Sequence, residues 1–231
     1  MRVVITGASR GIGRACVKKF LDEGHEVFGI DVENDLYASK IYLGDKAGNY
    51  THHCRNVKSD RALPQIRCVD ILINNAGTQD NDAIDVNLKG LIRTTEEYGL
   101  QPNIKSICNM ASVSAHNGAE FPYYVASKGG VLSYTKWTAK EIAKYGATCN
   151  SLSFGGVMTD LNQSVMDDDE AWEEIMCMTP LRKWMTPEEC AEWVYFLTVI
   201  NKSCTAQDIV VDNGELFNHT FVWREEEEDV F

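Results

Sequence analysis

The sequence has few basic residues for its length. Lys and Arg number 22 among 231 residues, against 34 Asp and Glu, which gives a formal net charge of −12. Nucleic acids and anionic membranes are bound through clustered Lys and Arg side chains. We therefore expect no nucleic-acid partner and no membrane partner.

Long apolar runs and paired cysteines are also lacking. No stretch has 18 uninterrupted apolar residues, so no transmembrane helix is expected. Met1 is followed at once by a strand pattern, which leaves no room for a signal peptide and predicts a cytoplasmic protein. The eight cysteines include no C-x-x-C pair, and free buried thiols are the expected state. The cluster at residues 52–54 places adjacent side chains on opposite strand faces, so no metal site is expected.

Strand and helix patterns alternate along the chain, with no repeat and no linker. The length fits one domain over residues 1–231. The alternation predicts an α/β fold, a doubly wound parallel sheet of about seven strands with helices on both faces. The expected strands lie at residues 3–5, 26–30, 50–53, 69–73, 104–110, 148–153 and 209–211.

The expected helices lie between these strands. One runs to about residue 23, one covers 83–98 with Ile84, Leu88, Leu91 and Ile92 on one stripe, and one runs from Tyr124 to about 145. Thr186, Pro187 and Glu189 predict a capped helix start. Residues 33–48 are expected to form a polar loop, and Pro64 interrupts a short crossover at 59–67.

A glycine-rich turn follows the first strand, at residues 6–13. It has the spacing G-x-x-x-G-x-G and opens a helix. Glycines let the backbone turn tightly and approach a ligand, and the unpaired N–H groups of the helix suit a pyrophosphate. This turn, with Gly7, Ser9, Arg10, Gly11, Ile12 and Gly13, is the first candidate cofactor site.

An acid ends the second strand pattern. In nucleotide-binding α/β units, an acid here accepts hydrogen bonds from the adenosine ribose and repels a 2′-phosphate. Asp31 therefore favours NAD over NADP, with an Asp that merely caps a turn as the alternative. Arg10 is a counter-signal, because a cation there could meet a phosphate.

Tyr124 and Lys128 lie four residues apart in a predicted helix. They are separated by about 40° around the helix axis, whereas Tyr123 stands about 140° from Lys128. A neighbouring ammonium favours the phenolate, so we expect Lys128 to lower the pKa of Tyr124. Tyr124 is then a candidate proton donor or acceptor.

The order of these motifs resembles the short-chain dehydrogenase/reductase family, of the compact single-domain type. The resemblance rests on residues 6–13, 74–77, Asn87, Ser112 and the Tyr124/Lys128 pair, and extends through residues 186–189 and 209–214. It implies catalytic roles for Asn87, Ser112, Tyr124 and Lys128. It implies cofactor contacts at Gly7, Gly11, Gly13, Asp31, Asn56, Val57, Asn75, Ala76, Gly77, Tyr124, Lys128, Val157 and Thr159.

Some of these roles have alternatives, and some positions depart from the family. Ser114 competes with Ser112, and Asn87 could be an ordinary helix residue rather than the holder of a water. Asn56 replaces the usual Asp, and Phe154 stands where the family usually has a proline. The segments 56–69 and 77–87 are shorter than usual, which predicts an open cleft or one completed by a partner subunit.

The resemblance implies an NAD(H)-dependent oxidoreductase that interconverts a secondary alcohol and a ketone. A non-catalytic NAD-sensing module of the same fold is the alternative, and the intact Ser112, Tyr124 and Lys128 argue against it. A sugar-nucleotide epimerase or dehydratase would need a larger C-terminal substrate domain. A homodimer or homotetramer is implied, through the helix at 124–145 and the last strand.

Residues 158–185 are expected to cover the substrate as a lid. Their mixture of acids with Met and Trp suits a neutral, partly apolar alcohol or ketone, and suits an acidic carrier protein or acyl-CoA poorly. The simpler alternative is that these apolar residues only pack the lid on the core. Residues 224–231 are expected to form a solvated acidic tail.

Overall fold

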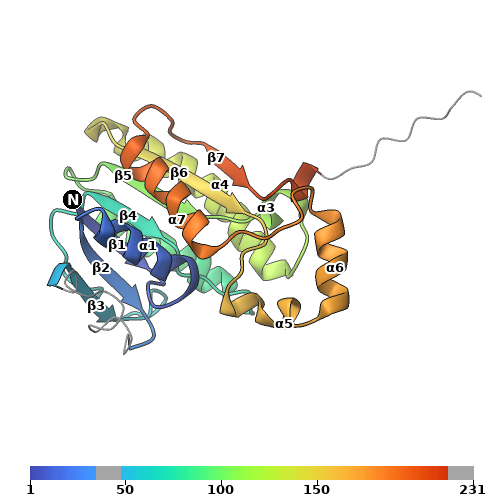
Figure 1. Ribbon diagram of the computed structural model, residues 1–231. Helices are drawn as coiled ribbons and strands as arrows, with labels where there is room; N and C mark the ends of the chain where they lie inside the picture. Colours follow the sequence, from blue (N-terminus) through green and yellow to red (C-terminus); the bar gives the residue numbers. More distant parts are fainter. Residues whose placement is uncertain (35–47, 218–231) are drawn as a thin grey trace, which may run out of the picture.

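A seven-stranded parallel sheet forms the centre of the molecule (Figure 1). The computed structural model describes residues 1–34 and 48–217. The strand order is β3-β2-β1-β4-β5-β6-β7, and every neighbouring pair is parallel. The strands are β1 Arg2–Thr6, β2 Glu26–Asp31, β3 Tyr50–Cys54, β4 Ile71–Asn74, β5 Ser106–Met110, β6 Thr148–Phe154 and β7 Asp208–Val211. The predicted doubly wound, Rossmann-like sheet is confirmed.

Strand β1 shows why both faces of the sheet are covered. Val3 and Ile5 pack into one hydrophobic cluster, while Val4 between them packs into a second cluster on the other face. Alternate strand residues point to opposite faces, so a strand that is apolar at every position needs helices on both sides. The chain leaves β1 outward to β2 and β3 and then returns to β4, which also pairs with β1. This reversal is where open α/β sheets bind ligands, beyond the carboxyl ends of the strands.

Helices α1 and α7 cover one face of the sheet and α4 covers the other (Figure 1). The helices α5 and α6 project beyond the carboxyl ends of the strands. The α-helices are α1 Gly11–Asp22, α2 Leu91–Thr94, α3 Ser114–Asn117, α4 Pro122–Ile142, α5 Gln163–Met166, α6 Asp169–Met178 and α7 Pro187–Tyr195. The other helical segments are η2 Ile84–Gly90, η3 Thr95–Gly99, η4 Ala143–Tyr145, η5 Asp160–Asn162, η6 Phe196–Ile200 and η7 Glu215–Phe217.

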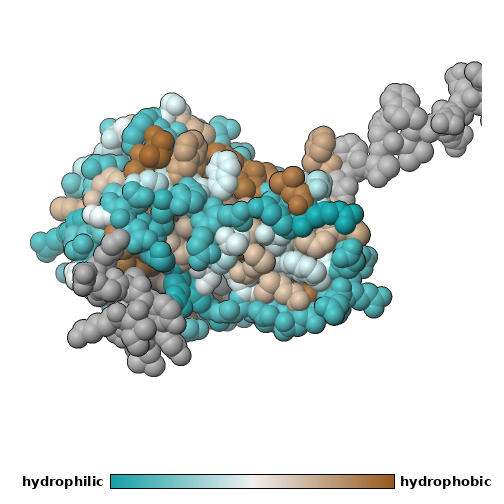
Figure 2. All heavy atoms as spheres, in the orientation of Figure 1, coloured by the Kyte–Doolittle hydropathy of each residue, from teal (hydrophilic) through white to brown (hydrophobic). Residues whose placement is uncertain are grey.

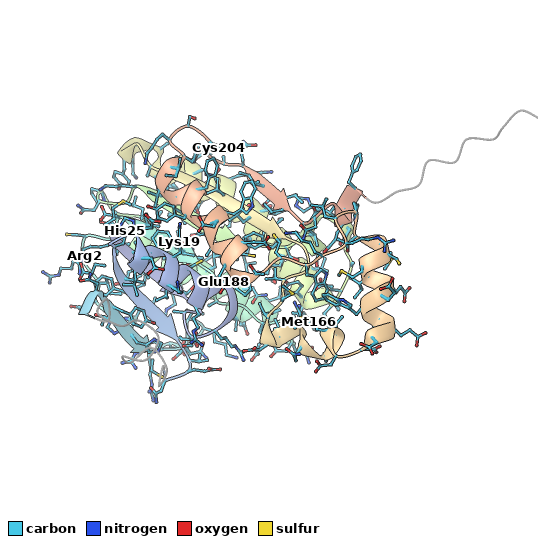
Figure 3. All side chains as sticks on the ribbon, in the orientation of Figure 1. Arg2, Lys19, His25, Met166, Glu188 and Cys204 are labelled. Atoms are coloured by element: carbon cyan, nitrogen blue, oxygen red, sulfur yellow. The ribbon has the colours of Figure 1, made fainter. Side chains whose placement is uncertain are left out.

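Lys19 joins α1 to α7 on the outer surface of the first face (Figure 3). Its ammonium lies 2.9 Å from the Glu192 carboxylate and 4.8 Å from the centre of the Tyr195 ring. Beneath this contact, Phe20 of α1 packs 5.2 Å from the Tyr195 ring. The glycine turn that begins α1 is therefore held on a helix pair that is packed against the core.

The helical segment at 84–99 buries a polar face in addition to part of the predicted apolar stripe, since Leu88 and Leu91 pack with Val131 of α4. Of the four stripe residues only Leu91 is buried, because the η2 and η3 turns are wider than an α-helix and rotate the face that meets the sheet. Thr94 Oγ1 donates to Asn74 Oδ1 over 2.6 Å in the buried interface. The amide of Asn74 donates to Asn109 Oδ1 over 2.9 Å. Buried hydrogen bonds therefore help to hold this segment on the sheet, where the sequence predicted apolar packing alone.

The crossover between β3 and β4 contains no helix, as the position of Pro64 predicted. The guanidinium of Arg93 donates to the carbonyl of Val57 over 3.1 Å and also to the carbonyls of Ser59 and Arg61. The Tyr98 hydroxyl donates to the Pro64 carbonyl over 2.8 Å. Side chains of the 84–99 segment thus satisfy backbone groups that a crossover helix would satisfy internally.

The remaining predicted elements are confirmed where they fall on described residues. The capping box is formed, since Glu189 N donates to Thr186 Oγ1 over 3.1 Å and Thr186 N donates to Glu189 Oε2 over 2.9 Å. Most of the predicted 33–48 loop and all of the acidic tail at 224–231 lie outside the described residues. The eight cysteines are free, but only Cys16, Cys108, Cys149 and Cys190 are buried, while Cys54, Cys68 and Cys177 are exposed. No helix within 1–34 or 48–217 is long and apolar enough to span a bilayer.

Candidate active site

The glycine turn between β1 and α1 has no room for larger side chains. Gly7 and Gly11 have φ of +66° and +51°, a region that L side chains rarely adopt. A Cβ added to Gly13 would lie 1.9 Å from the Gly7 carbonyl oxygen. Asn75, from the end of β4, donates its amide to that same oxygen over 3.0 Å and to the Thr6 carbonyl over 3.1 Å. The turn is therefore tied to the switch point of the sheet.

This turn fits a dinucleotide pyrophosphate. The N-terminus of α1 carries no side-chain cap and no acid in its first turn, so its backbone N–H groups are open. Gly7, Gly11 and Ile12 line a cleft of about 540 Å³ that continues past Asn75, Ala76 and Gly77. Of the predicted turn residues, Gly13 and Ser9 do not line it. Gly13 acts through close backbone packing, and Ser9 through its N–H group, which donates to Asp31.

Both acidic and basic groups line the adenosine end of the cleft, where β2 ends. Asp31 Oδ2 accepts from Ser9 N over 2.9 Å, and its Oδ1 accepts from Glu33 N over 3.1 Å. The Arg10 guanidinium lies 3.7 Å from the Glu33 carboxylate. Its charge is therefore partly balanced within the chain. Asn56 and Val57, predicted to contact the adenine, line the same end.

The predicted catalytic side chains converge at the other end of the cleft. Ser112 follows β5, while Tyr124 and Lys128 come from adjacent turns of α4, and all three line the cleft. The Lys128 ammonium lies 5.5 Å from the centre of the Tyr124 ring and donates to the Met110 carbonyl over 2.8 Å. Elements far apart in the sequence thus bring a phenol, an ammonium and a hydroxyl to one place.

Burial decides the proton affinities of these groups. Desolvation raises the pKa of Tyr124 to about 12, although a hydrogen bond with Ser112 acts in the opposite direction. Burial also lowers the pKa of Lys128 to about 8. Burial therefore raises the Tyr124 pKa above its ordinary value, and the predicted lowering of this pKa by Lys128 stays a prediction. The phenol is protonated at neutral pH, which suits proton donation to a carbonyl.

Of the two candidate serines, Ser112 is the one that faces the cleft. Ser112 lines it, whereas Ser114 is 1% exposed and does not. Ser112 Oγ donates to Ser114 Oγ over 3.1 Å. The preference for Ser112 is thus consistent with its placement, and Ser114 lies directly behind it.

Comparisons with known proteins agree with this geometry. A family model described as enoyl-(acyl carrier protein) reductase matches residues 7–215. The chain is 34% identical over 239 residues to a 3-oxoacyl-[acyl-carrier-protein] reductase of Chlamydia pneumoniae, with 92% of this chain and 96% of the relative covered. A Vibrio harveyi protein of the same name is 30% identical, with coverage of 93% and 96%.

A solved structure also matches over almost the whole chain. A 4-hydroxyisoleucine dehydrogenase mutant complexed with NADH and succinate is similar with a TM-score of 0.84 at 26% identity, covering 95% of this chain and 100% of that one. The chain belongs to the short-chain dehydrogenase/reductase family. It is an oxidoreductase of this family, with a nicotinamide dinucleotide as its cofactor.

Asn87 lies apart from the cleft in this short-chain dehydrogenase/reductase. It is 2% exposed, and its amide is used within the chain. Its Oδ1 accepts from Thr78 N over 2.8 Å, while its Nδ2 donates to the Thr78 carbonyl over 2.9 Å and to Ser127 Oγ over 3.0 Å. Asn87 therefore fixes the shortened 77–87 segment against α4, and its predicted role with a water stays a prediction.

The nicotinamide end of this short-chain dehydrogenase/reductase has two features that the sequence analysis missed. Glu215 Oε1 accepts from Gly156 N over 2.8 Å, and a Cβ on Gly156 would lie 1.9 Å from the Trp184 indole nitrogen. Glu120 lines the cleft as well. The Gly155-Gly156 pair, beside Phe154 in place of a proline, was the only sequence signal for this packing. Val157 and Thr159, predicted at the carboxamide, line the cleft here.

The lid residues of this short-chain dehydrogenase/reductase divide into two groups. Leu161 lines the cleft, whereas Trp172 packs edge-on against Trp184 at 5.0 Å between ring centres. Met176 is buried away from the cleft, and Met178 is exposed. Met166, at the end of α5, lies at the opposite end of the molecule from Arg2 and His25 (Figure 3). Most of the apolar residues of 158–185 therefore do not line the cleft, and some of them pack within the lid.

Proposed function

We propose that this chain interconverts a secondary alcohol and a ketone with NAD(H), using Tyr124 as the general acid and base. The observation that carries the proposal is the convergence of Ser112, Tyr124 and Lys128 on the cleft that begins at the glycine turn. A non-catalytic NAD-sensing module would not need a proton donor and a second hydroxyl beside the cofactor cleft. The bound dinucleotide supplies the hydride donor or acceptor.

Tyr124, Ser112 and Lys128 have separate roles in the proposed reaction. In ketone reduction the Tyr124 hydroxyl gives its proton to the carbonyl oxygen, and in alcohol oxidation the phenolate takes that proton back. Ser112 donates a hydrogen bond to the same oxygen as negative charge develops on it. Lys128 would bind ribose hydroxyls of the cofactor, and its charge would stabilise the phenolate once the proton has left. With its pKa raised to about 12, Tyr124 holds at neutral pH the proton that ketone reduction requires.

Asp31 and Glu33 support NAD rather than NADP. Two carboxylates at the end of β2 disfavour a 2′-phosphate, and the Arg10 guanidinium is already paired with Glu33. The NADH-bound structural relative at 26% identity supports the same choice. An NADP-bound relative, a putative 2-deoxy-d-gluconate 3-dehydrogenase, is 24% identical, so that likeness concerns the fold alone.

Substitution at Asp31 tests the cofactor choice. We expect NADH to bind wild-type protein at least about tenfold more tightly than NADPH, because the carboxylate is lost as a ribose acceptor and opposed by phosphate in the NADPH complex. Asp31→Asn removes the charge and keeps an acceptor, so the preference should fall by about tenfold. Fluorescence titration with both dinucleotides measures this. Tighter NADPH binding by the wild type would contradict the assignment.

The substrate proposal is a free, uncharged ketone or secondary alcohol. Glu120 and Glu215 face the substrate end, which disfavours anionic substrates, and Leu161 and Trp184 provide apolar surface. A 3-oxoacyl group on a carrier protein is the second candidate, favoured by the names of the relatives at 34% and 30% identity. NADH oxidation with a panel of free ketones and with a 3-oxoacyl carrier thioester separates the two. Turnover of the carrier-bound substrate alone would reject the first candidate.

We also infer that the chain forms a homodimer or homotetramer. Large apolar side chains are exposed on α4, where Trp137 is 45% exposed, and on η6, where Phe196 is 47% exposed. Figure 2 shows apolar atoms over the side of the molecule that carries α7 and β7. Sedimentation analysis distinguishes these assemblies from a monomer.

A further inference from the structure

The serine at the substrate end is the first member of a hydrogen-bond chain that ends at Glu120. Ser112 Oγ donates to Ser114 Oγ over 3.1 Å, and Ser114 Oγ donates to Glu120 Oε1 over 2.8 Å. Both serines are buried, at 5% and 1% exposure. The chain therefore connects the inside of the site to a carboxylate at the cleft surface, with little competition from solvent.

The direction of this chain follows from its chemistry. An ionised carboxylate can only accept hydrogen bonds, and each serine hydroxyl has one proton to donate. Glu120 therefore accepts a hydrogen bond from Ser114, and Ser114 accepts one from Ser112. The Ser112 proton then points away from the cleft, whereas stabilising a substrate oxygen requires the same proton to point into it.

The oxygen of Ser112 is fixed independently of this choice. The backbone N–H of Ser114 donates to Ser112 Oγ over 3.2 Å. Rotation about the Cβ–Oγ bond of Ser112 can therefore move the proton while the oxygen stays in place. The free energy difference between the two proton positions depends on how strongly Ser114 accepts.

Glu120 is held where it can act on this chain. Its φ is 81°, in the left-handed region that is uncommon for residues other than glycine. The carboxylate reaches back across one short segment to Ser114 and also lines the cleft. Ser114 itself does not line the cleft, so a bound substrate would meet Ser112 and Glu120 but not the hydroxyl between them.

We propose that Glu120, acting through Ser114, controls whether the Ser112 hydroxyl proton points toward the substrate oxygen or away from it. Glu120 is a positioning residue in this scheme, and the inference rests on the proposed ketone reduction. Ionised Glu120 holds the proton outward, and substrate must break the Ser112–Ser114 bond. A neutral group at position 120 holds it less strongly, because hydrogen bonds to charged acceptors are about twice as strong as neutral ones.

Other charged groups also face Glu120 and must be separated from the effect. Tyr124 and Lys128 on α4 both feel its negative charge, as does Glu215 on η7. Neutralising Glu120 could therefore alter the reaction directly through the cleft. Only an effect that passes through the two serine hydroxyls supports the proposal.

The test measures ketone reduction at saturating NADH in wild-type, Glu120→Gln, Ser114→Ala and the double variant. We expect Glu120→Gln to raise kcat/KM about fivefold at neutral pH, because the outward bond becomes neutral. Ser114→Ala should give a rise of similar size, and the double variant should match Ser114→Ala. Glu215→Gln, which neutralises a nearby carboxylate without a bond to Ser114, should keep its full effect in the Ser114→Ala background.

Three results would overturn the proposal. Glu120→Gln could leave kcat/KM unchanged in an active enzyme. Its effect could persist in full in the Ser114→Ala or Ser112→Ala background, which would indicate a direct field through the cleft. A wild type that reduces no ketone and oxidises no alcohol would refute the proposed function, and this inference with it.

Discussion

The two ends of the cleft differ in the groups that form their surfaces. At the glycine turn of the cofactor end, backbone groups and glycines form the surface, and Asn75 ties the turn to the sheet through hydrogen bonds to main-chain oxygens. At the substrate end, side chains from separate segments meet, including Glu120, Trp184 and Glu215. Backbone geometry restricts which residues are possible, whereas a surface of side chains can be assembled in many ways. The residues of the first end are therefore restricted by the fold, whereas the side chains of the second end can differ from one family member to another.

Replacing Gly13 should break the cofactor end with the largest effect. In Gly13→Ala the new Cβ would lie 1.9 Å from the Gly7 carbonyl oxygen, so the turn or the helix must shift. We expect a loss of about 3 kcal/mol in the free energy of unfolding. NADH binding should fall below detection. Chemical denaturation and fluorescence titration measure the two effects.

Gly129 on α4 provides the matched control. A Cβ there would meet nothing within 4 Å, so Gly129→Ala should stabilise the chain by up to about 1 kcal/mol through helix propensity. Equal behaviour of the two variants would show that the close packing at Gly13 does not matter. The claim that backbone geometry restricts the residues of the glycine turn would then be wrong.

Lys128 lies between the two ends of the cleft, and we expect its buried ammonium to lower the stability of the folded chain. Burial lowers its pKa to about 8 from 10.5, so below pH 8 the folded chain carries a buried charge that disfavours folding. Between pH 8 and 10.5 the unfolded chain binds more protons, and wild-type stability should rise with pH. Lys128→Met should therefore stabilise the chain by about 1–2 kcal/mol at pH 7, allowing for the lost bond to Met110. The gain should shrink toward pH 10.5.

Denaturant titrations at several pH values measure this difference. Lys140→Met, on the exposed side of the same helix, should change stability little and show no such pH dependence. If Lys128→Met destabilised the chain at pH 7, the ammonium would be better solvated than its burial implies.

Thr186 should give the smallest effect, at the substrate end. Its capping box begins α7 immediately after Trp184 and Met185, which pack beside the Gly155-Gly156 turn. Thr186→Ala should cost about 1 kcal/mol of stability. Since strands and glycines rather than this cap hold the cofactor, NADH affinity should not change. A large fall in NADH affinity would show that the two ends are more strongly coupled than proposed.

The sequence predicted those parts of the fold that depend on local patterns. Apolar runs located most of the strands, and Thr186 with Glu189 located the start of α7. Helical periodicity placed Tyr124 beside Lys128, which the structure confirms at 5.5 Å from ring centre to ammonium. Each of these depends on residues close together in the chain or on a family-wide motif order.

Features that depend on long-range packing were missed. The pKa of Tyr124 rises because several elements bury it together, which the spacing to Lys128 alone could not reveal. Glu215 reaches the site only because the chain after β7 folds back onto Gly156. The 84–99 segment buries Thr94 against Asn74 because its wider turns change the face that an ideal helix would present.

The most direct test of the account is kinetic analysis of Tyr124→Phe beside Tyr123→Phe. Loss of the Tyr124 hydroxyl should lower kcat for ketone reduction about 10³-fold by removing the general acid. It should change the Kd for NADH by no more than about threefold, because the glycine turn and Asp31 remain. Tyr123, which is 54% exposed, should tolerate the same change with kcat close to wild type. A Tyr124→Phe protein with wild-type kcat would contradict the central claim that this phenol carries the proton.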